Sequence, residues 1–278
     1  MKVVLADHAG ACYGVQRALD MALKASESAS SAHTLGPLIH NPGVVRDLES
    51  RGVSVAANLD EIEDGTIIIR SHGVTPEVHD AVMAKGLPVV DATCPHVLRA
   101  QKAAADLARK GCRVIVVGEK GHPEVEGLRA YARREGAKVD VVPYPDSVPD
   151  DLRAPIGVVV QTTQSAARLA EVVSALLTRT EELRVVNTIC EATSGHQGAC
   201  AELAARADVM VVIGGRNSAN TTRLAEIARA ACPRTHHVEG ADELDPSWFE
   251  GASVVGVTAG ASTPEDQIAA LVAVLEQL

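Results

Sequence analysis

Aromatic residues are nearly absent from this chain of 278 residues, which contains three tyrosines, one tryptophan and one phenylalanine. A chain of this length nevertheless buries a large core. That core must therefore consist of valine, isoleucine, leucine and alanine, which favours buried parallel strands covered by alanine-rich helices. The length itself suits one to three domains.

Long apolar runs are also missing. Residues 1–6 are apolar apart from Lys2, but this segment is too short for the core of a signal peptide, and Asp7 and His8 follow at once. No run approaches the roughly 20 apolar residues that a membrane-spanning helix needs. We therefore predict a cytoplasmic protein that does not enter a membrane. The formal net charge of −10 further argues against general binding to nucleic acid or to anionic membranes.

Several common motifs do not occur. There is no Cys-x-x-Cys pair, so a zinc ribbon or a thioredoxin-type site is not supported. There is no Walker lysine loop and no Gly-x-Gly-x-x-Gly fingerprint, so nucleotide binding is not indicated. In a cytoplasmic protein the six cysteines are not expected to form disulfides. Metal binding or catalysis is the better expectation for them.

Short apolar segments alternate with helical patterns along the whole chain. The clearest predicted strands are at 66–70, 113–117 and 209–213, and each is followed by a polar loop and a helical pattern. This alternation predicts an α/β protein with mainly parallel sheets. Ligands of such sheets bind where the strands end, and the unusual polar residues of this chain occur in those exit loops.

Three cysteines have equivalent places, each in a loop that leaves a strand just before a helix. Cys12, Cys94 and Cys190 are separated by 82 and 96 residues, so they divide the chain into comparable thirds. We expect three similar α/β lobes, over residues 1–94, 95–189 and 190–278, each directing one thiolate to a shared centre. Three thiolates in one place repel one another unless a metal neutralises them.

The spacing leaves three readings of these cysteines open. A zinc site with three cysteines needs a fourth ligand such as histidine. A cubane iron–sulfur cluster held by three cysteines leaves one iron open for substrate. Alternatively, the three are unconnected buried residues, which is a common state of free cysteine. The positions of Cys112, Cys200 and Cys232 indicate buried structural residues.

The segment around Cys94 shows how a thiolate is favoured. Cys94 follows a predicted strand and precedes a helix predicted at 97–109, whose positive end stabilises negative charge. We expect Asp91 and Thr93 to cap this helix and Pro95 to suit its first turn.

Polar side chains that can bind an anion occupy other strand-exit loops. Three histidines are in equivalent loops, and two serines and an asparagine stand beside helix starts, where free backbone N–H groups suit a phosphate. The alternatives are ordinary satisfied histidines and simple helix caps. These residues are His40, His72, His122, Ser218, Asn220 and Ser262.

Glu124 is the best candidate for a proton donor. It shares a loop with His122, and it could meet the loop that carries Thr162 and Thr163 after a neighbouring strand. A carboxylic acid beside hydroxyl groups in a closed pocket can act as a general acid. The alternative is an exposed glutamate that the dipole of the following helix favours.

Nine segments in order resemble those of one family of iron–sulfur enzymes, the 4-hydroxy-3-methylbut-2-enyl diphosphate reductases (IspH/LytB). Each segment alone is weak, but the ordered set runs nearly end to end and is very specific. The segments are Cys12-Tyr-Gly-Val-Gln-Arg-Ala18, His40-Asn41, Ser71-His-Gly-Val74, Asp91-Ala-Thr-Cys-Pro95, Gly121-His-Pro-Glu-Val-Glu-Gly127, Gln161-Thr-Thr163, Ile189-Cys190 with Ala192-Thr193, Asn217-Ser-Ala-Asn220 and Thr258-Ala-Gly-Ala-Ser262.

The resemblance implies a trefoil of three α/β lobes around one [4Fe–4S] cluster. Cys12, Cys94 and Cys190 would hold this cluster and leave one iron open. The reaction would be the last step of the non-mevalonate isoprenoid pathway, a two-electron reductive dehydroxylation that gives isopentenyl and dimethylallyl diphosphates. The electrons would come from an external ferredoxin or flavodoxin, since no flavin or nicotinamide motif is visible.

The resemblance also assigns roles around the substrate. Its 4-hydroxyl would bind the open iron, Glu124 and Thr162 would help to deliver the proton, and Thr163 would line the pocket. Ala219 departs from the pattern, because many members have a second diphosphate-binding serine there. The residues implied to bind the diphosphate are His40, His72, His122, Ser218, Asn220 and Ser262.

Two other functions remain open at this stage. One is a related iron–sulfur enzyme that hydrates or dehydrates a diphosphate without net electron transfer. The other is a non-catalytic protein that binds a metal or a diphosphate. The combination of Glu124 and Thr162 with the phosphate-binding residues favours the reductase.

Overall fold

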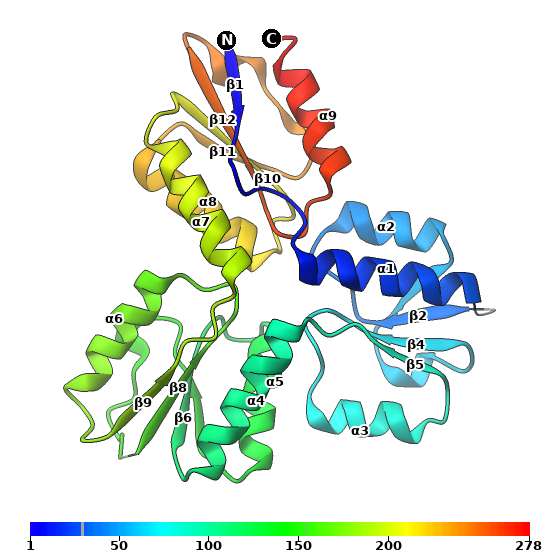
Figure 1. Cartoon of the computed structure of the whole chain (residues 1–278), viewed down its shortest axis with the longest axis vertical. Coiled ribbons are helices and arrows are strands. Elements are labelled where there is room, and N and C mark those ends of the chain that lie inside the picture. The colour runs from blue at the N-terminus through cyan, green and yellow to red at the C-terminus, as the bar shows by residue number, and fades with distance from the viewer. Residues whose placement is uncertain (29–30, 154) are drawn as a thin grey trace. The chain divides into compact units, whose positions relative to one another are not determined.

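The fold consists of parallel sheets with helices on their faces, seen here in a computed structural model that describes residues 1–28, 31–153 and 155–278. Within these residues, twelve strands form three four-stranded sheets, and all the pairings are parallel. The predicted class, three α/β lobes with parallel sheets, is therefore confirmed (Figure 1).

The chain divides into two compact units. The terminal unit contains Met1–Gln16, Ile39–Arg46 and Glu191–Leu278. The central unit contains Arg17–Leu38 and Asp47–Cys190. The terminal unit holds one sheet and the central unit holds the other two.

The first sheet of the central unit has the strand order β3-β2-β4-β5. Its middle strand β4 carries three isoleucines that are fully or almost fully buried, which fits a strand covered on both faces. Thr75 caps α3, as the Thr-Pro sequence favours. The elements are β2 (Ala32–Leu35), α2 (Pro42–Ser50), which begins in the terminal unit, β3 (Val53–Ala56), η1 (Leu59–Glu61), β4 (Thr66–Ile69), α3 (Pro76–Ala84) and β5 (Val89–Asp91).

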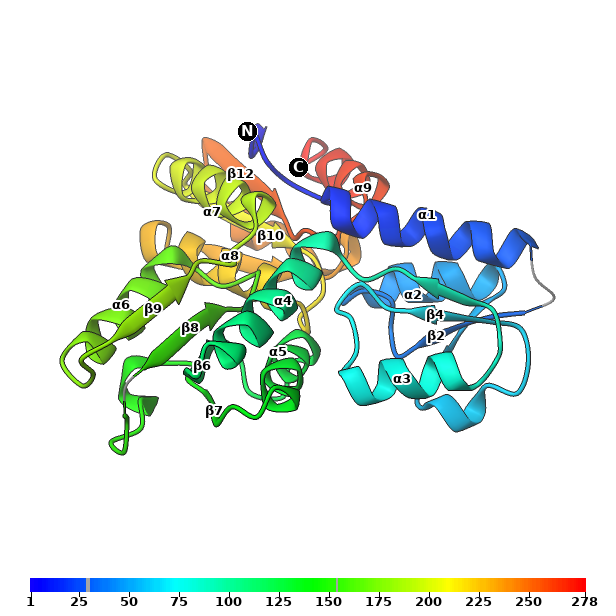
Figure 2. The ribbon, with the colours of Figure 1, turned by 60° about the horizontal axis from the view of Figure 1, so that its bottom comes forward.

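The second sheet of the central unit has the order β7-β6-β8-β9. Helices α4 and α5 pack on each other and against this sheet (Figure 2). The elements are α4 (Pro95–Arg109), β6 (Arg113–Val117), α5 (Pro123–Arg134), β7 (Val139–Val141), η2 (Pro145–Ser147), β8 (Ile156–Val160), α6 (Ala166–Leu177) and β9 (Leu183–Val186).

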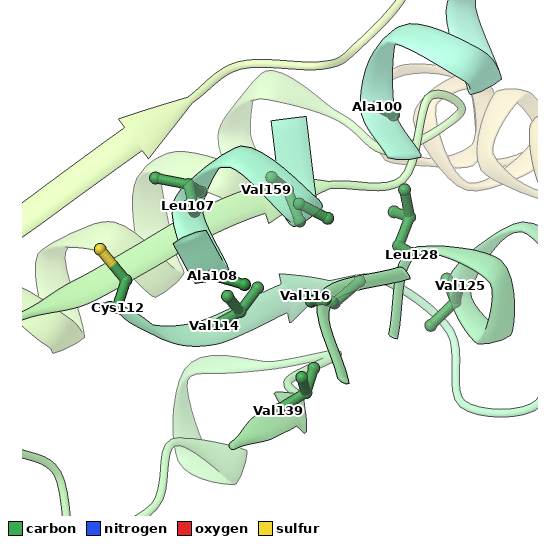
Figure 3. Close-up of a cluster of buried hydrophobic side chains, with 12 residues drawn as sticks. Ala100, Leu107, Ala108, Cys112, Val114, Val116, Val125, Leu128, Val139 and Val159 are labelled. Carbon is green, nitrogen blue, oxygen red and sulfur yellow. The ribbon is translucent and has the colours of Figure 1, made fainter. Parts of the chain in front are cut away.

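The apolar residues of strand β6 are consecutive because the strand is covered on both faces. Val114 and Val116 belong to a buried cluster with residues of α4 and α5 (Figure 3). Ile115 belongs to another cluster, with residues of α6. Because successive side chains of a strand point to opposite faces, a strand covered on both faces must be apolar at every position.

The sheet of the terminal unit has the order β1-β12-β10-β11 and combines both ends of the chain. The only phenylalanine, Phe249, is 6% exposed and packs in its core. The elements are β1 (Lys2–Leu5), α1 (Tyr13–Ser28), which begins in this unit, α7 (Glu191–Ala204), β10 (Val209–Ile213), α8 (Ala219–Ala231), β11 (Thr235–Val238), η3 (Ala241–Glu243), η4 (Pro246–Phe249), β12 (Val254–Ala259) and α9 (Glu265–Leu275).

Two local expectations need correction. The strand Lys2–Leu5, expected in the first lobe, pairs with β12, with Lys2 opposite Val254. An apolar strand pattern does not specify which sheet the strand joins. The sequence pattern predicts a helix over about 197–207, whereas α7 begins six residues earlier, at Glu191. The Ser194-Gly195 pair weakened the helical pattern in its first turns. The lobe boundaries at 94 and 189 remain a prediction.

The three sheets share one strand order if the strands are counted from the one that precedes Cys12, Cys94 or Cys190. That strand is β1, β5 or β9, and it is an edge strand in every case. The second strand is then β12, β4 or β8, and the third is β10, β2 or β6. All the other candidate site residues lie in loops or helix starts that follow the second and third strands.

The cluster in Figure 3 gives a test of the core. Leu128 is fully buried there, whereas Leu177 on α6 is 62% exposed. We expect Leu128→Ala to lower the free energy of unfolding by about 2–5 kcal/mol, because it removes buried methylenes and leaves a cavity. Leu177→Ala should change it by no more than about 0.5 kcal/mol. Equal effects of the two substitutions in urea titrations would contradict this packing.

Candidate functional site

The three candidate cysteines each stand immediately before a helix. Cys12 precedes α1, Cys94 is the N-cap residue of α4, and Cys190 precedes α7. All three cysteines are partly exposed, which suits a metal ligand or a nucleophile.

The other three cysteines are buried, as expected. Cys112 is 2% exposed, Cys200 0% and Cys232 3%. Burial raises the pKa of the Cys112 thiol, and it raises that of the Cys200 thiol to about 11. These thiols therefore remain protonated near neutral pH and behave as small apolar residues.

Each candidate cysteine is fixed by its backbone to the loop that leaves the neighbouring strand. In all three cases the cysteine N–H donates a hydrogen bond to a backbone carbonyl of that loop. The same contact thus recurs once in each sheet, and it places each thiol beside a loop that carries other candidate site residues. The bonds run from Cys12 to Ala261 (3.1 Å), from Cys94 to Ser71 (2.9 Å) and from Cys190 to Thr162 (3.1 Å).

The expected capping of α4 by Asp91 and Thr93 was wrong. The helix begins at Pro95, two residues earlier than predicted, so Cys94 is the N-cap residue and makes no side-chain capping bond. The Asp91 carboxylate instead accepts hydrogen bonds from the backbone N–H and the hydroxyl of Thr93. Arg17 donates to the carbonyl of Thr93 at 3.2 Å. These contacts shape the loop that presents Cys94, and Pro95 occupies the first turn as expected.

In the terminal unit, the loops of His40 and Ser262 are bound to each other. The Ser262 hydroxyl donates to the His40 carbonyl at 3.2 Å, and the Asn41 amide donates to the Ser262 carbonyl at 2.9 Å. Sequence reasoning noted Asn41 only as a neighbour of His40. Because these residues are more than 220 positions apart in the chain, no local pattern could have identified this positioning role.

The first turn of α8 presents Ser218 and Asn220. Ser218 is the N-cap residue, and its oxygen accepts from the Thr221 N–H at 3.4 Å. The capping interpretation is therefore correct for Ser218, although its hydroxyl hydrogen remains able to donate. Asn220 is 3% exposed, and neither its amide nitrogen nor its amide oxygen has a partner among the described residues. Because an unpartnered buried amide is costly, Asn220 suits a polar ligand.

Gly215 lets the His40 loop approach the loop before α8. A Cβ atom at Gly215 would lie 2.7 Å from the His40 carbonyl oxygen, closer than a side chain tolerates. The terminal unit thus brings His40 and the start of α8 together at the ends of its strands.

In the central unit, His72 and His122 form an edge-to-face pair with ring centroids 5.6 Å apart. His122 is the N-cap residue of α5, and its Nδ1 accepts a hydrogen bond from the Glu124 N–H at 3.2 Å. In the neutral ring the hydrogen must then be on Nε2. His122 is thereby prepared to donate from Nε2, as binding of an anion requires.

Glu124 and Thr162 do meet, as the sequence predicted. Glu124 is 2% exposed, so the alternative of an exposed glutamate is wrong. The backbone N–H of Thr162 lies 2.6 Å from Glu124 Oε1, and its hydroxyl oxygen lies 2.8 Å from Oε2. Burial raises the pKa of Glu124 to about 7, because it outweighs the opposing effect of the two hydrogen bonds from Thr162.

Thr163 is held by a residue to which sequence reasoning assigned no role. Gln161 is 1% exposed, and its amide nitrogen donates to the Thr163 hydroxyl at 3.1 Å. Its amide oxygen accepts from the Glu119 N–H at 3.0 Å. The available signal was a glutamine directly after a strand of buried valines, a place where an amide must have partners.

The predicted site residues thus fall into two sets, one in each unit. Within each set the loops at the ends of the strands are connected as described above, while the roles of the residues as ligands remain predictions. The terminal unit carries Cys12, His40, Ser218, Asn220 and Ser262, and the central unit carries His72, Cys94, His122, Glu124, Thr162, Thr163 and Cys190.

Comparison with known proteins decides the family. A family model described as LytB protein matches residues 3–276 of the chain. The chain belongs to the LytB family. A relative from Pelobacter propionicus is 51% identical over 266 residues, which cover 95% of this chain and 94% of the relative. One from Citrifermentans bemidjiense is 52% identical over 270 residues, covering 95% and 93%. Both relatives are named 4-hydroxy-3-methylbut-2-enyl diphosphate reductase.

Two solved structures of diphosphate reductases share the fold. The structure of (E)-4-hydroxy-3-methyl-but-2-enyl diphosphate reductase, described as the terminal enzyme of the non-mevalonate pathway, has a TM-score of 0.73 and 42% identity over 99% of both chains. A reductase from Plasmodium falciparum, described as acting on E-1-hydroxy-2-methyl-but-2-enyl-4-diphosphate, has a TM-score of 0.92 and 26% identity, covering 98% of this chain and 87% of that one. In the described part of this LytB-family chain, none of the helices has the length and apolar character to span a membrane.

The raised pKa of Glu124 makes stability depend on pH. Between the ordinary value of 4.5 and about 7, the folded protein keeps a proton on Glu124 that the unfolded chain releases. The stabilisation is therefore complete below about pH 4.5 and is lost as the pH rises through about 7, a change of roughly 3 kcal/mol.

We expect Glu124→Gln to remove this contribution. Urea unfolding gives the free energy of unfolding of both proteins. The value for wild type minus the value for the variant should fall as the pH rises from 4.5 to 8. Leu128→Ala serves as the control, since it should lower stability equally at each pH. Parallel pH profiles for wild type and Glu124→Gln would show that Glu124 has an ordinary pKa.

Proposed function

We propose that this chain is a 4-hydroxy-3-methylbut-2-enyl diphosphate reductase, the terminal enzyme of the non-mevalonate pathway. It would remove the 4-hydroxyl of its substrate with two electrons and two protons, giving water and isopentenyl or dimethylallyl diphosphate. Relatives of that name at about half identity support the proposal. The observation that carries the chemistry is the buried Glu124–Thr162 pair, in which the carboxyl group titrates near neutral pH.

The cysteines fit the iron–sulfur cluster that the family resemblance implies. Cys12, Cys94 and Cys190 are the partly exposed cysteines, each at the positive end of a helix, and thiolate is the natural ligand type. We propose that these three hold one [4Fe–4S] cluster with an open iron. Once bound, such a cluster would supply electrons one at a time and a Lewis-acidic site for the substrate oxygen.

The histidines, serines and asparagine would bind the diphosphate. His122 offers an Nε2–H donor, because its Nδ1 accepts from the Glu124 N–H. Ser218 and Asn220 offer a hydroxyl and a buried amide at the N-terminus of α8, where the helix dipole also favours an anion. His40, His72 and Ser262 complete the proposed set.

Glu124 would provide the proton that converts the leaving hydroxyl into water. With a pKa of about 7, a large share of Glu124 is protonated at neutral pH. The protonated Oε2 can donate to the Thr162 hydroxyl oxygen across 2.8 Å, which frees the Thr162 hydrogen to donate to the substrate. A general acid with a pKa near the working pH is the most effective kind. Thr163, held by Gln161, would line the same pocket.

The electrons must come from outside the chain. No flavin or nicotinamide motif occurs in the sequence, so a ferredoxin or flavodoxin is the proposed partner. A hydration or dehydration enzyme would need the same acid but no electron donor. The requirement for electrons therefore separates the reductase from that alternative.

The decisive experiment is an anaerobic assay of the iron-reconstituted protein with the diphosphate substrate and a one-electron donor. We expect both isoprenoid diphosphates as products only when the donor is present. Glu124→Gln should lower kcat by about 10²–10⁴-fold with little change in KM, because it removes the general acid. A protein with a full cluster that gives no turnover would refute the proposed function.

The ligand assignment has its own test. Cys94→Ser should abolish the visible absorption and the iron content of the reconstituted protein, because the partly exposed Cys94 thiol is a proposed ligand. Cys112→Ala serves as the matched control and should retain both, because Cys112 is packed in the core of the same unit. Loss of the cluster in both variants, or in neither, would show that the ligands were wrongly assigned.

A further inference from the structure

A pocket lies in the central unit, outside the proposed reductase site. It has a volume of about 400 Å³ and opens where β2, β3 and β4 end, next to α3 and the start of α5. Its lining is mainly apolar and includes Leu35, Leu59, Val74, Val78 and Pro123. None of the residues proposed to hold the cluster or the diphosphate lines it.

One cationic side chain, Arg70, faces this apolar pocket. Arg70 follows β4 directly, and its Nε is buried with no hydrogen-bond partner. Among the described residues, no hydrogen bond or ion pair involves its guanidinium. Burial lowers the pKa of Arg70, and no nearby carboxylate opposes that effect. The pocket therefore contains a cation without a counter-charge.

The surrounding residues leave space for Arg70 but do not neutralise its charge. Gly36 leaves room for the guanidinium, since a Cβ atom there would lie 2.6 Å from Arg70 Nη1, and Gly36 has a φ of +74°. The only acidic residue in the lining is Glu126. Its carboxylate is bound to Arg129 at 2.9 Å.

Arg70 is partly buried, and a charge that is partly removed from water is stabilised when an opposite charge lies beside it. A guanidinium presents its N–H groups in a planar fork that matches carboxylate and phosphate oxygens. We propose that this pocket binds a small amphiphilic oxyanion, whose carboxylate or phosphate group pairs with Arg70 and whose short apolar body packs against Leu35, Val74 and Val78. The proposal does not depend on the reductase activity.

The location gives such a ligand a way to affect the reductase site. Arg70 is two residues from His72, and Pro123 lies between His122 and Glu124. A ligand between Arg70 and Pro123 would therefore contact the segments that carry both histidines. The pocket is suited to an effector whose chemistry is that of an acid or a phosphate ester with a short aliphatic chain.

Binding can be measured by calorimetry on the reconstituted protein with four probes: hexanoate, hexyl phosphate, inorganic phosphate and 1-hexanol. We expect hexanoate or hexyl phosphate to bind, and the difference between them identifies the preferred head group. Inorganic phosphate and hexanol, each lacking one half of the proposed ligand, should bind at least tenfold more weakly. Failure of both amphiphilic probes to bind would overturn the proposal.

Arg70→Met is the informative variant, and Arg51→Met is its matched control. Arg51 is an exposed arginine paired with Asp47, and it does not line the pocket. Arg70→Met should weaken binding of the amphiphilic anion by about tenfold or more, as loss of a charge-assisted hydrogen bond does, while Arg51→Met should leave it unchanged. Equal affinity in wild type and Arg70→Met would overturn the proposal.

Stability provides a second, independent readout. Replacing a partly buried charge that has no counter-charge with an apolar side chain of similar shape should maintain or raise the midpoint of thermal unfolding. We expect this result for Arg70→Met in the absence of any probe. A marked fall in the midpoint would show that the guanidinium is paired inside the protein, and the pocket would then not be an anion site.

Discussion

Parallel pairing brings the end of each edge strand beside the end of its neighbour, and the candidate sites of this protein depend on that register. In each sheet the N–H of a cysteine after the edge strand donates to a carbonyl in the neighbouring loop. The thiol is fixed by backbone contacts, and the side chains of the loops remain available for ligands. A β-sheet with antiparallel neighbours would send alternate loops to opposite ends and separate these residues.

Much of this arrangement could be predicted from the sequence, because interior strands such as β4, β8 and β10 are buried at every position and form continuous apolar segments. The cysteines were recognisable by their equivalent places before helices, and the contact of Glu124 with Thr162 followed from neighbouring strand ends. Residues whose role depends on distant partners were harder to interpret. The role of Asn41 requires Ser262, more than 220 positions away, and the pairing of β1 with β12 has no local signal.

The buried acid illustrates a conflict between stability and chemistry. Full burial of Glu124 destabilises its ionised form, and two hydrogen bonds from Thr162 only partly offset that effect. The protein thereby keeps a proton on a carboxyl group near neutral pH, which an exposed glutamate does not do. Arg70 shows a related conflict with the opposite sign of charge, since a partly buried cation, with no partner for its Nε among the described residues, lies beside a mainly apolar pocket.

The pairing of β1 with β12 has a consequence for biosynthesis. A ribosome makes Lys2–Leu5 before the two central sheets and Val254–Ala259 after them, so β1 has no neighbouring strand until the residues between them have been synthesised. The two sheets of the central unit consist of contiguous strands and can form earlier. The loop of Cys12, whose N–H donates to the Ala261 carbonyl, therefore gains this contact only after both central sheets have been synthesised.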